Sequence, residues 1–523
     1  MLQWYEDQKS SLINHPISLS LLLMLFSTHF LLWLNGYWAT KILKLPPSPP
    51  RLPVIGHLHR LGTLPHRSLQ VLSQKYGPLM LLHLGFTPTV VVSSAEMGRE
   101  IMKTHDIIFS DRPNTKAVKE FFYGGKDAAF APYGEYWRQM RKICVIDLLS
   151  VKRVQSFRYV RDEEVNEMVN KIKELCSLKK EVNLSELIIG VTNNLISRVV
   201  LGKRLEGKER IDLIKEIVEL FGIFSFEDLF PSWGWIDVLT GLTRRMKKTA
   251  KALHMLLDEV IEEHLTSPKT DAHADKKDMV DLLLEAEKDP SLGIEFTRDS
   301  HRALILDMFI AGTETSYTTL EWVMAELVTH PNVLNKLKDE VRGVVGKKCK
   351  IDEDDIYQMD YLKCVIKEGL RLHPPIVLSL PRVTTASVDI EGYHIPAKTR
   401  VLVNLWAICR DPKTWDRPDE FIPERFLNNP VDYKGAHFEF IPFGAGRRGC
   451  PGIAFGITFA ESILANLLCW FDWELTGGSN KIDVNMTEAF GLSVHLKHPL
   501  VLVPTLATQC GCGCGFECGC GYA

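Results

Sequence analysis

The sequence predicts a mainly α-helical domain with a small β part. Apolar residues recur with helical periodicity at 135–150, 160–176, 208–222, 245–266, 298–330, 331–346, 361–372 and 453–470. Two apolar, β-branched stretches, at 79–93 with a turn at Gly85 and at 388–404, predict hairpins. Strands and helices do not alternate along the chain and no segment repeats, so a doubly wound sheet is not expected.

The bulk composition is that of an ordinary globular protein. The 523 residues are 46% hydrophobic and 24% charged, with a net charge of -3. This balance gives no sign of a nucleic-acid partner. Of the twelve cysteines, five lie at the end of the chain, at 510, 512, 514, 518 and 520, and the other seven follow no regular spacing. A disulfide-stapled secreted fold is therefore not expected.

An apolar segment near the N-terminus predicts a membrane anchor. Residues 17–34 read ISLSLLLMLFSTHFLLWL and carry no formal charge when His29 is neutral. This run is about the length that crosses a bilayer. A cleavable signal peptide is the alternative, but the run is long for one and no small-x-small cleavage site follows.

The anchor divides the chain into five expected parts. Lys41, Lys44 and Arg51 follow the apolar segment, and this positive charge places the main body in the cytoplasm. The prolines at 46, 47, 49 and 50 predict a stiff, extended hinge. The expected parts are a lumenal N-terminus (1–16), a transmembrane anchor (17–38), a basic and proline-rich hinge (39–56), a catalytic domain (57–508) and a Cys/Gly-rich tail (509–523).

The segment FGAGRRGCPG at 443–452 is the sharpest motif. Its glycines let the backbone turn tightly and approach a flat group, and Cys450 comes just before a helical run, where the helix dipole favours a thiolate. The spacing of Gly444, Gly446 and Gly449 also matches a dinucleotide-binding fingerprint, but no βαβ unit follows. A buried structural cysteine is the other alternative, and it leaves the glycines and Arg448 unexplained.

Three further patterns predict polar contacts. Glu368 and Arg371 share one face of the helix expected at 361–372. Trp137 and Arg141 are one helical turn apart, and both suit a carboxylate. A glycine inside a helix destabilises it by about 1 kcal/mol relative to alanine. Gly312 lies in the middle of the helix expected at 298–330, so it should have a function there.

These motifs together resemble the cytochrome P-450 superfamily. Its signature Phe-x-x-Gly-x-Arg-x-Cys-x-Gly is met in full at 443–452, and 368–371, 423–426, 311–316 and 137–141 match other family motifs in the right order. The resemblance implies a triangular helical domain with a long central helix over heme b, whose iron is ligated by Cys450. It further implies cofactor contacts from Phe443, Gly446, Trp137, Arg141, Arg112, Arg382 and Arg448, the arginines and Trp137 serving the propionates.

The resemblance also assigns roles around the heme. Glu368 and Arg371 should form a buried structural triad with Arg425, and Gly312 should open a groove for dioxygen. Glu314 and Thr315 would be the catalytic acid and alcohol that deliver protons beside that groove. His373, which directly follows the triad helix, is expected to be a structural histidine rather than an iron ligand.

Within the superfamily the chain is most similar to the plant microsomal A-type branch, particularly the family numbered seventy-one. The likeness rests on KYGPLM at 75–80, AGTETSYTTLEW at 311–322 and FGAGRRGCPG. It implies a monooxygenase of the endoplasmic reticulum membrane that hydroxylates or epoxidises a terpenoid, coumarin or phenylpropanoid. NADPH would supply electrons through a separate flavoprotein reductase, for which Arg138, Lys142 and Arg447 are possible docking charges.

Several alternatives stay open. Within the fold, a heme-thiolate dehydratase or isomerase acting on an oxime would not need Glu314 and Thr315. A heme-binding sensor or electron carrier would bind the cofactor without turnover, and the tail at 509–523 could bind a soft metal or have no function. The substrate is not determined by the sequence, but the resemblance places its pocket at Phe121, Phe122, Phe130, Met308, Ala311, Val377 and Leu492.

Overall fold

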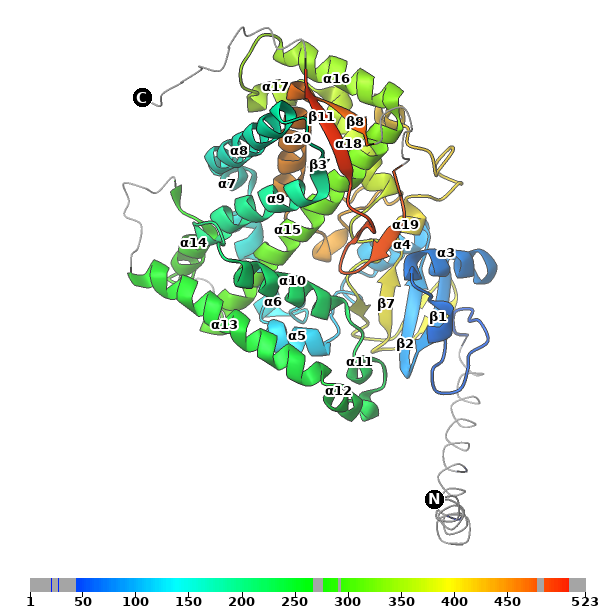
Figure 1. Ribbon diagram of the computed structural model, residues 1–523. Helices are drawn as coiled ribbons and strands as arrows, with labels where there is room; N and C mark the ends of the chain where they lie inside the picture. The colour runs from blue at the N-terminus through cyan, green and yellow to red at the C-terminus, as the bar shows by residue number, and fades with distance from the viewer. Residues whose placement is uncertain are drawn as a thin grey trace, which may run out of the picture.

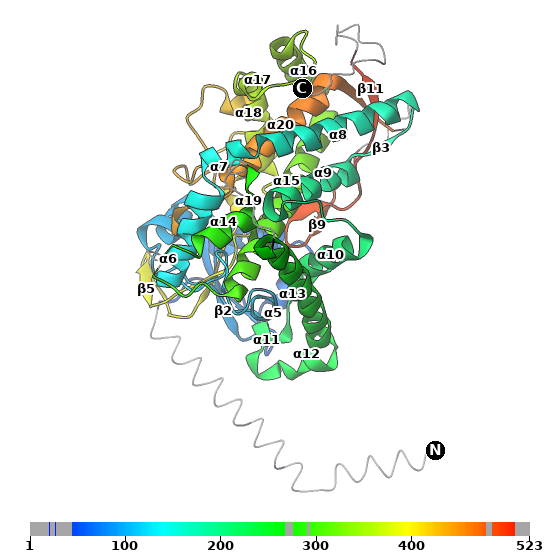
Figure 2. The same ribbon diagram turned by 90° about the vertical axis from the view of Figure 1, so that its left-hand side faces the viewer.

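The computed structural model describes residues 44–266, 276–289, 293–476 and 484–507, together with Ser20 and Ser27. The predicted N-terminus and anchor and the Cys/Gly-rich tail lie outside the described residues. Most of the described chain is helical, and a small β part lies to one side of the helices (Figures 1 and 2). The predicted class, mainly α with a small β part, is confirmed.

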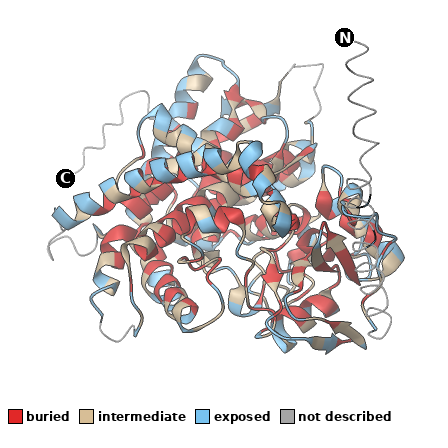
Figure 3. Ribbon diagram, turned by 90° about the horizontal axis from the view of Figure 1, so that it is seen from below, coloured by how far each residue is buried: buried red, intermediate tan, exposed pale blue. Residues whose placement is uncertain are grey.

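A long central helix organises the helical part. This helix, α15, spans Arg298–Thr329 and begins with a capping box between Thr297 and Ser300. Most of its residues are buried, and buried segments run through the interior of the molecule (Figure 3). The other predicted helices are present as α6 (Glu135–Lys142), α8 (Arg158–Ser177), α10 (Lys208–Gly222), α13 (Leu242–Thr266), α16 (Pro331–Val345), α18 (Asp360–Leu372) and α20 (Ile453–Trp470).

Helix α9, at Leu184–Leu201, was not predicted, although it packs directly along α15. Apolar residues occupy most of its faces, so it shows no clear amphipathic period. Helices α9 and α20 are both long and apolar enough to cross a membrane, but 67% and 72% of their apolar windows are buried in the protein. They are therefore core helices, and they say nothing for or against the predicted anchor.

The main sheet has the strand order β1-β2-β7-β4, in which β4 is the short strand Arg382–Val383. The predicted hairpin at 79–93 is present as β1 (Leu79–Leu84) and β2 (Thr87–Val92), with Leu79 opposite Val92. The prediction of one hairpin at 388–404 was only partly right. Strands β5 (Val388–Ile390) and β6 (Tyr393–Ile395) form that hairpin, whereas β7 (Arg400–Val403) leaves it to pair in parallel with β2.

Two smaller sheets near the C-terminus were not predicted. Strand β11 (Val501–Leu506) lies between β3 (Val182–Asn183) and β8 (Phe471–Leu475), and β9 (Glu488–Phe490) pairs with β10 (Val494–Leu496). The β9–β10 sheet packs against α15, because the Trp322 indole N–H donates to the Val494 carbonyl at 2.8 Å. This contact holds the turn at 491–493 beside the middle of α15.

The described part of the predicted hinge is not a free spacer. The Leu81 N–H donates to the Pro47 carbonyl at 2.9 Å, and the His394 N–H donates to the Lys44 carbonyl at 2.7 Å. The His57 ring also hydrogen-bonds the Pro49 carbonyl at 2.8 Å. Residues 44–56 are therefore hydrogen-bonded to the folded domain.

Candidate functional site

Cys450 lies on a glycine-rich loop just before α20. Gly446, in the short turn η8 (Gly446–Arg448), has a φ of +69°, and a side chain there would meet the Met102 carbonyl oxygen at 2.0 Å. Only glycine fits such a position. The Cys450 N–H donates to the Phe443 carbonyl at 2.9 Å, and the Gly452 N–H donates to the Cys450 sulfur at 3.3 Å. These contacts aim the sulfur into the cavity beneath α15.

Desolvation opposes ionisation of Cys450 when no metal is bound. Burial raises the pKa of this thiol, while the Gly452 N–H and the Arg141 guanidinium lower it, and the net change is upward. A bound metal cation would supply the missing positive charge, since a coordinating thiol loses its proton.

Four arginines line the same cavity: Arg112, Arg141, Arg382 and Arg448. Burial, followed by the repulsion from Arg382 and Arg448, lowers the pKa of Arg112. The Arg141 guanidinium makes no hydrogen bond or ion pair within the described part of the chain, and burial lowers its pKa too. Crowded cations of this kind fit an anionic group that is not a protein side chain.

Arg112, Arg448 and Trp137 are held by backbone carbonyls. Arg112 Nε donates to the Ala129 carbonyl at 2.9 Å, and Arg448 Nη2 donates to the Ala131 carbonyl at 2.6 Å. The Trp137 indole N–H, predicted to face a carboxylate, donates to the Ala128 carbonyl at 3.1 Å. Its ring instead lies 4.3 Å from the Arg448 guanidinium. Trp137 thus positions Arg448, and its N–H is already in use.

Arg382 is anchored differently, through an ion pair. Its Nη1 lies 3.2 Å from the Asp106 carboxylate, which is buried. The same carboxylate accepts the Arg447 N–H at 2.9 Å and so ties η8 to Arg382. The cysteine loop and the arginine cluster are therefore one connected unit.

The middle of α15 lines the opposite side of the cavity with Ala311, Gly312, Glu314 and Thr315. A side chain at Gly312 would meet Ile196 of α9 at 2.6 Å. The missing side chain at Gly312 thus leaves room for the Ile196 side chain, a packing role that the expected dioxygen groove did not include. The helix continues unbroken through this segment.

Glu314 and Thr315 lie side by side on α15. The Thr315 hydroxyl donates to the Ala311 carbonyl at 2.6 Å, and Glu314 Oε1 accepts from the Ser493 hydroxyl at 2.8 Å. Burial raises the pKa of Glu314, an effect that the Ser493 hydrogen bond partly offsets. An acid that keeps its proton closer to neutral pH is suited to proton delivery.

Glu368, Arg371 and Arg425 meet as the resemblance implies. Arg371 Nε and Nη2 donate to the two Glu368 oxygens at 2.8 and 2.9 Å, and Arg425 Nε donates to Glu368 at 2.9 Å. Arg371 and Glu368 are fully buried, and Arg371 Nη1 donates to the Pro418 carbonyl at 2.7 Å. His373 pairs with Glu326 at 2.6 Å, away from the cavity.

The cavity has a volume of about 320 Å³, and most of its wall is apolar. Of the predicted pocket residues, Phe122, Phe130, Met308, Ala311 and Leu492 line it, whereas Phe121 and Val377 do not. Phe121 is fully buried in the main core, and Val377 packs with Trp406 and Val494. The local pattern marked both as apolar but did not show which way they face.

The sequence analysis missed Phe221, near the end of α10. Its ring lies 5.7 Å from that of Phe122 and 5.2 Å from that of Phe130, and these two are 5.5 Å apart. The three rings form an aromatic wall of the cavity. The only signal in the sequence was the amphipathic period at 208–222, which identifies an inward face but not what that face meets.

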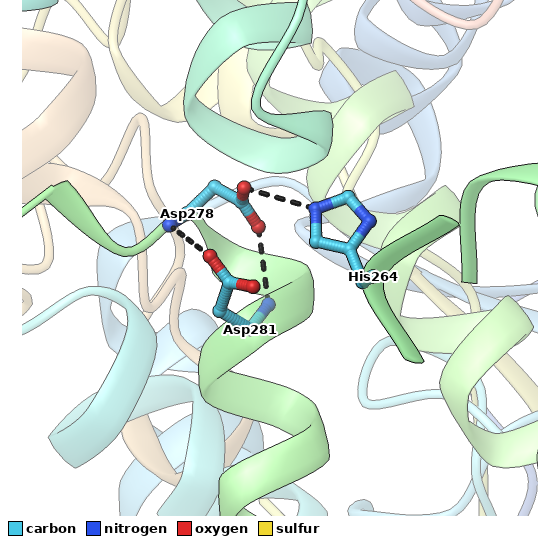
Figure 4. Close-up of side chains that lie close together, drawn as sticks. All are labelled: His264, Asp278 and Asp281. Atoms are coloured by element: carbon cyan, nitrogen blue, oxygen red, sulfur yellow. Dashed lines mark hydrogen bonds and ion pairs between the residues drawn. The ribbon is translucent and has the colours of Figure 1, made fainter. Parts of the chain in front are cut away.

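A second polar cluster lies away from the cavity, where α13 ends and α14 (Met279–Ala286) begins (Figure 4). His264, Asp278 and Asp281 bring ligand-type atoms within 4.8 Å of one another. Their contacts are structural: Asp278 and Asp281 form a capping box, and His264 Nε2 pairs with Asp278 at 3.0 Å. The cluster therefore connects two helices.

Comparison with known proteins agrees with this geometry. The sequence matches the cytochrome P-450 family over residues 46–503. It is 54% identical to cytochrome P-450 71A1 of Persea americana over 86% of this chain and 91% of that protein. It is 51% identical to the phenylacetaldehyde oxime monooxygenase of Prunus mume over 88% and 89%. A zebra fish cytochrome P-450 structure with progesterone superposes with a TM-score of 0.73 at 26% identity, covering 85% of this chain and 99% of that one.

A mainly helical fold in which Cys450 and four arginines line one cavity is that of a heme-thiolate monooxygenase. The chain belongs to the cytochrome P-450 family. It is similar to plant members of the family numbered seventy-one. The family implies a heme thiolate, which fits the cysteine loop and the cation cluster, in which Arg141 has no hydrogen-bond or ion-pair partner among the described residues.

Proposed function

We propose that the chain hydroxylates or epoxidises a small apolar plant metabolite of the terpenoid, coumarin or phenylpropanoid class. The aromatic wall formed by Phe122, Phe130 and Phe221 carries this proposal. Such rings favour flat or hydrocarbon ligands, because aromatic contacts add to the free energy of apolar burial. Met308 and Leu492 extend the wall with further apolar surface.

In this proposal Cys450 would ligate the heme iron, and Arg112, Arg141, Arg382 and Arg448 would hold the propionates. The bound heme would supply the oxidising chemistry, because a thiolate ligand favours cleavage of the O–O bond. Glu314 and Thr315 hold and pass protons on the α15 side, and the apolar wall orients the substrate and limits water. Phe443, on the loop before Cys450, contributes apolar contact.

The names of relatives support oxidation of specialised metabolites. Besides the oxime monooxygenase, a desmethylyatein synthase of Sinopodophyllum hexandrum is 45% identical over 93% of this chain and 98% of that protein. A dehydratase or isomerase remains the second candidate function. The presence of both Glu314 and Thr315 beside the cavity favours the monooxygenase, because proton delivery is needed to reduce dioxygen.

We further propose that electrons come from NADPH through a separate flavoprotein reductase in the endoplasmic reticulum membrane. The proposed docking charges Arg138, Lys142 and Arg447 are all exposed. Arg447 is also ion-paired to Asp106 at 3.1 Å, and Asp106 in turn holds Arg382. A partner docked at Arg447 would thus lie close to the loop that carries Cys450.

The function is tested by reconstituting the purified protein with heme, a plant reductase and NADPH. Difference spectra over small terpenoids, coumarins, phenylpropanoids and oximes select the ligands that enter the cavity. With a selected ligand, we expect NADPH consumption and one atom from isotopically labelled dioxygen in the product. Product without NADPH consumption would favour the isomerase or dehydratase, and binding without turnover would favour a sensor or carrier.

Deleting residues 1–40 should release much, but not all, of the protein from membranes. An apolar patch of Phe86, Phe226, Trp235, Val238 and Leu239 is exposed on the folded domain and should retain a fraction. Phe86 links this patch to the β1–β2 turn through its contact with Phe230, at 5.2 Å between ring centroids.

The measurement is the soluble fraction after a carbonate wash. Adding Val238→Asp and Leu239→Asp to the deletion should move most of the remaining protein into that fraction. The same two changes in the full-length chain should have little effect. Complete membrane retention of the deletion variant would contradict a single N-terminal anchor.

A further inference from the structure

Two aspartates outside the proposed chemistry lie buried beside the cavity. Asp307 is on α15, one turn before Ala311, and Asp127 is in the loop that precedes α6. Asp127 is fully buried and Asp307 is 7% exposed. Neither forms an ion pair within the described part of the chain. Burying two ionised carboxylates without a cation partner would cost desolvation free energy, which their surroundings must offset.

The two carboxyl groups meet at the same stretch of backbone, because Asp307 accepts the N–H of Ala128, the residue that follows Asp127. Asp127 Oδ2 accepts the Phe130 N–H at 3.0 Å, whereas its Oδ1 is buried and has no hydrogen-bond partner among the described residues. A hydrogen bond between two carboxyl groups would require a proton on one of them, because an ionised carboxylate can only accept. Burial raises the pKa of Asp307, and the negative charge of Asp127 raises it further. Burial likewise raises the pKa of Asp127, to about 6.

The pair holds one side of the loop at 128–131. Asp307 Oδ2 accepts the N–H groups of Ala128 and Ala129 at 2.8 and 3.2 Å. The carbonyls of this loop point the other way, toward Trp137, Arg112 and Arg448. The same peptide groups thus join the acid pair on one side to the residues of the proposed propionate site on the other.

We propose that Asp127 and Asp307 share one proton and that this protonated pair is a positioning device for the loop at 128–131. When the proton is lost at alkaline pH, the two carboxylates repel and the loop moves away from α15. Trp137, Arg112 and Arg448 then lose their fixed carbonyl partners. The inference goes beyond the proposed substrate class and does not depend on it.

Other titratable groups also face the pair. Arg112 and Arg448 favour the ionised form from the cation side. Tyr136 of α6 and Cys144 of η3 (Ile143–Leu148) adjoin both aspartates, and burial raises the pKa of each. Both are therefore neutral through the range in which the pair is expected to titrate. The direction of the pH effect therefore follows from the two aspartates. A carboxyl with a raised pKa keeps its proton at neutral pH and loses it as the pH rises.

The test uses the heme-bound, full-length protein and three variants. Asp307→Asn preserves the shape, and its amide can donate to Asp127 and accept from Ala128 at every pH. Asp127→Asn provides the reciprocal change. Asp111→Asn is the matched control, because Asp111 also accepts a backbone N–H nearby, from Tyr133 at 3.1 Å, but lies outside the pair.

Hydrogen exchange of peptides covering 127–131 is measured from neutral to alkaline pH and corrected for the intrinsic rate. Heme transfer to apomyoglobin is followed in parallel. In the wild type and in Asp111→Asn, protection should fall by about tenfold, the factor expected for losing one or two hydrogen bonds, and heme transfer should accelerate. In Asp307→Asn, both the protection of these peptides and the rate of heme transfer should be independent of pH.

The proposal is overturned if the wild type shows no pH dependence or if Asp307→Asn keeps the wild-type slope. If Asp307→Asn does not yield heme-bound protein, Asp127→Asn decides by the same criteria. Failure of both would also contradict the proposal, because an amide at either position reproduces the protonated pair. These readouts need no substrate, so their outcome is separate from that of the monooxygenase assay.

Discussion

Cys450→Ser is expected to abolish the thiolate-type spectrum of the ferrous carbon monoxide complex and all monooxygenase activity. The serine hydroxyl is neither soft nor acidic enough to replace the sulfur as an iron ligand. The backbone around it should persist, because the Cys450 N–H still donates to the Phe443 carbonyl and Gly446 still fits against Met102. Absorption spectroscopy of the reduced, carbon monoxide-treated protein measures the change.

Cys144 offers a matched control. It is a second buried thiol near Arg141, but it does not line the cavity. Cys144→Ser should therefore keep the spectrum, with some loss of stability from placing a hydroxyl in an apolar site. If Cys450→Ser kept the thiolate-type spectrum, or if Cys144→Ser lost it in folded protein, the ligand assignment would be wrong.

Thr315→Ala is expected to leave heme binding nearly intact but to uncouple NADPH consumption from product formation. Thr315 lines the cavity from α15, and among the described residues its hydroxyl donates only to the Ala311 carbonyl one turn back. Removing it takes away a proton-delivering group but no proposed iron or propionate contact. General acid groups contribute about 10²- to 10⁴-fold to rates, so product should fall steeply while hydrogen peroxide rises.

The measurement is the ratio of product formed to NADPH oxidised. Thr315→Ser keeps the hydroxyl and should retain most of the coupling. Thr313→Ala tests the same motif two residues earlier, where the hydroxyl is buried and does not line the cavity, and it should leave the ratio unchanged. An unchanged ratio in Thr315→Ala would remove this residue from the catalytic proposal.

Local sequence patterns were sufficient for the elements whose signal is periodic. Helix α15 lies within one residue of its predicted span, and the hairpin of β1 and β2 turns at Gly85 as predicted. Helix α9 was not predicted, because a helix buried on most faces shows no amphipathic period. The parallel pairing of β7 with β2 was not predicted, because it joins strands more than three hundred residues apart in the sequence.

The sequence by itself determined the class of protein, because the cysteine loop demands particular residues at a fixed spacing, such as glycine where Gly446 meets Met102. Only the tertiary structure decided what those residues meet. In the tertiary structure Gly312 packs against Ile196, Phe221 lies in the cavity wall, and Phe121 lies outside that wall. The tertiary structure also joined Asp127 to Asp307 across 180 positions of the chain. Contacts of this kind arise from packing between distant segments, and no local period or motif encodes them.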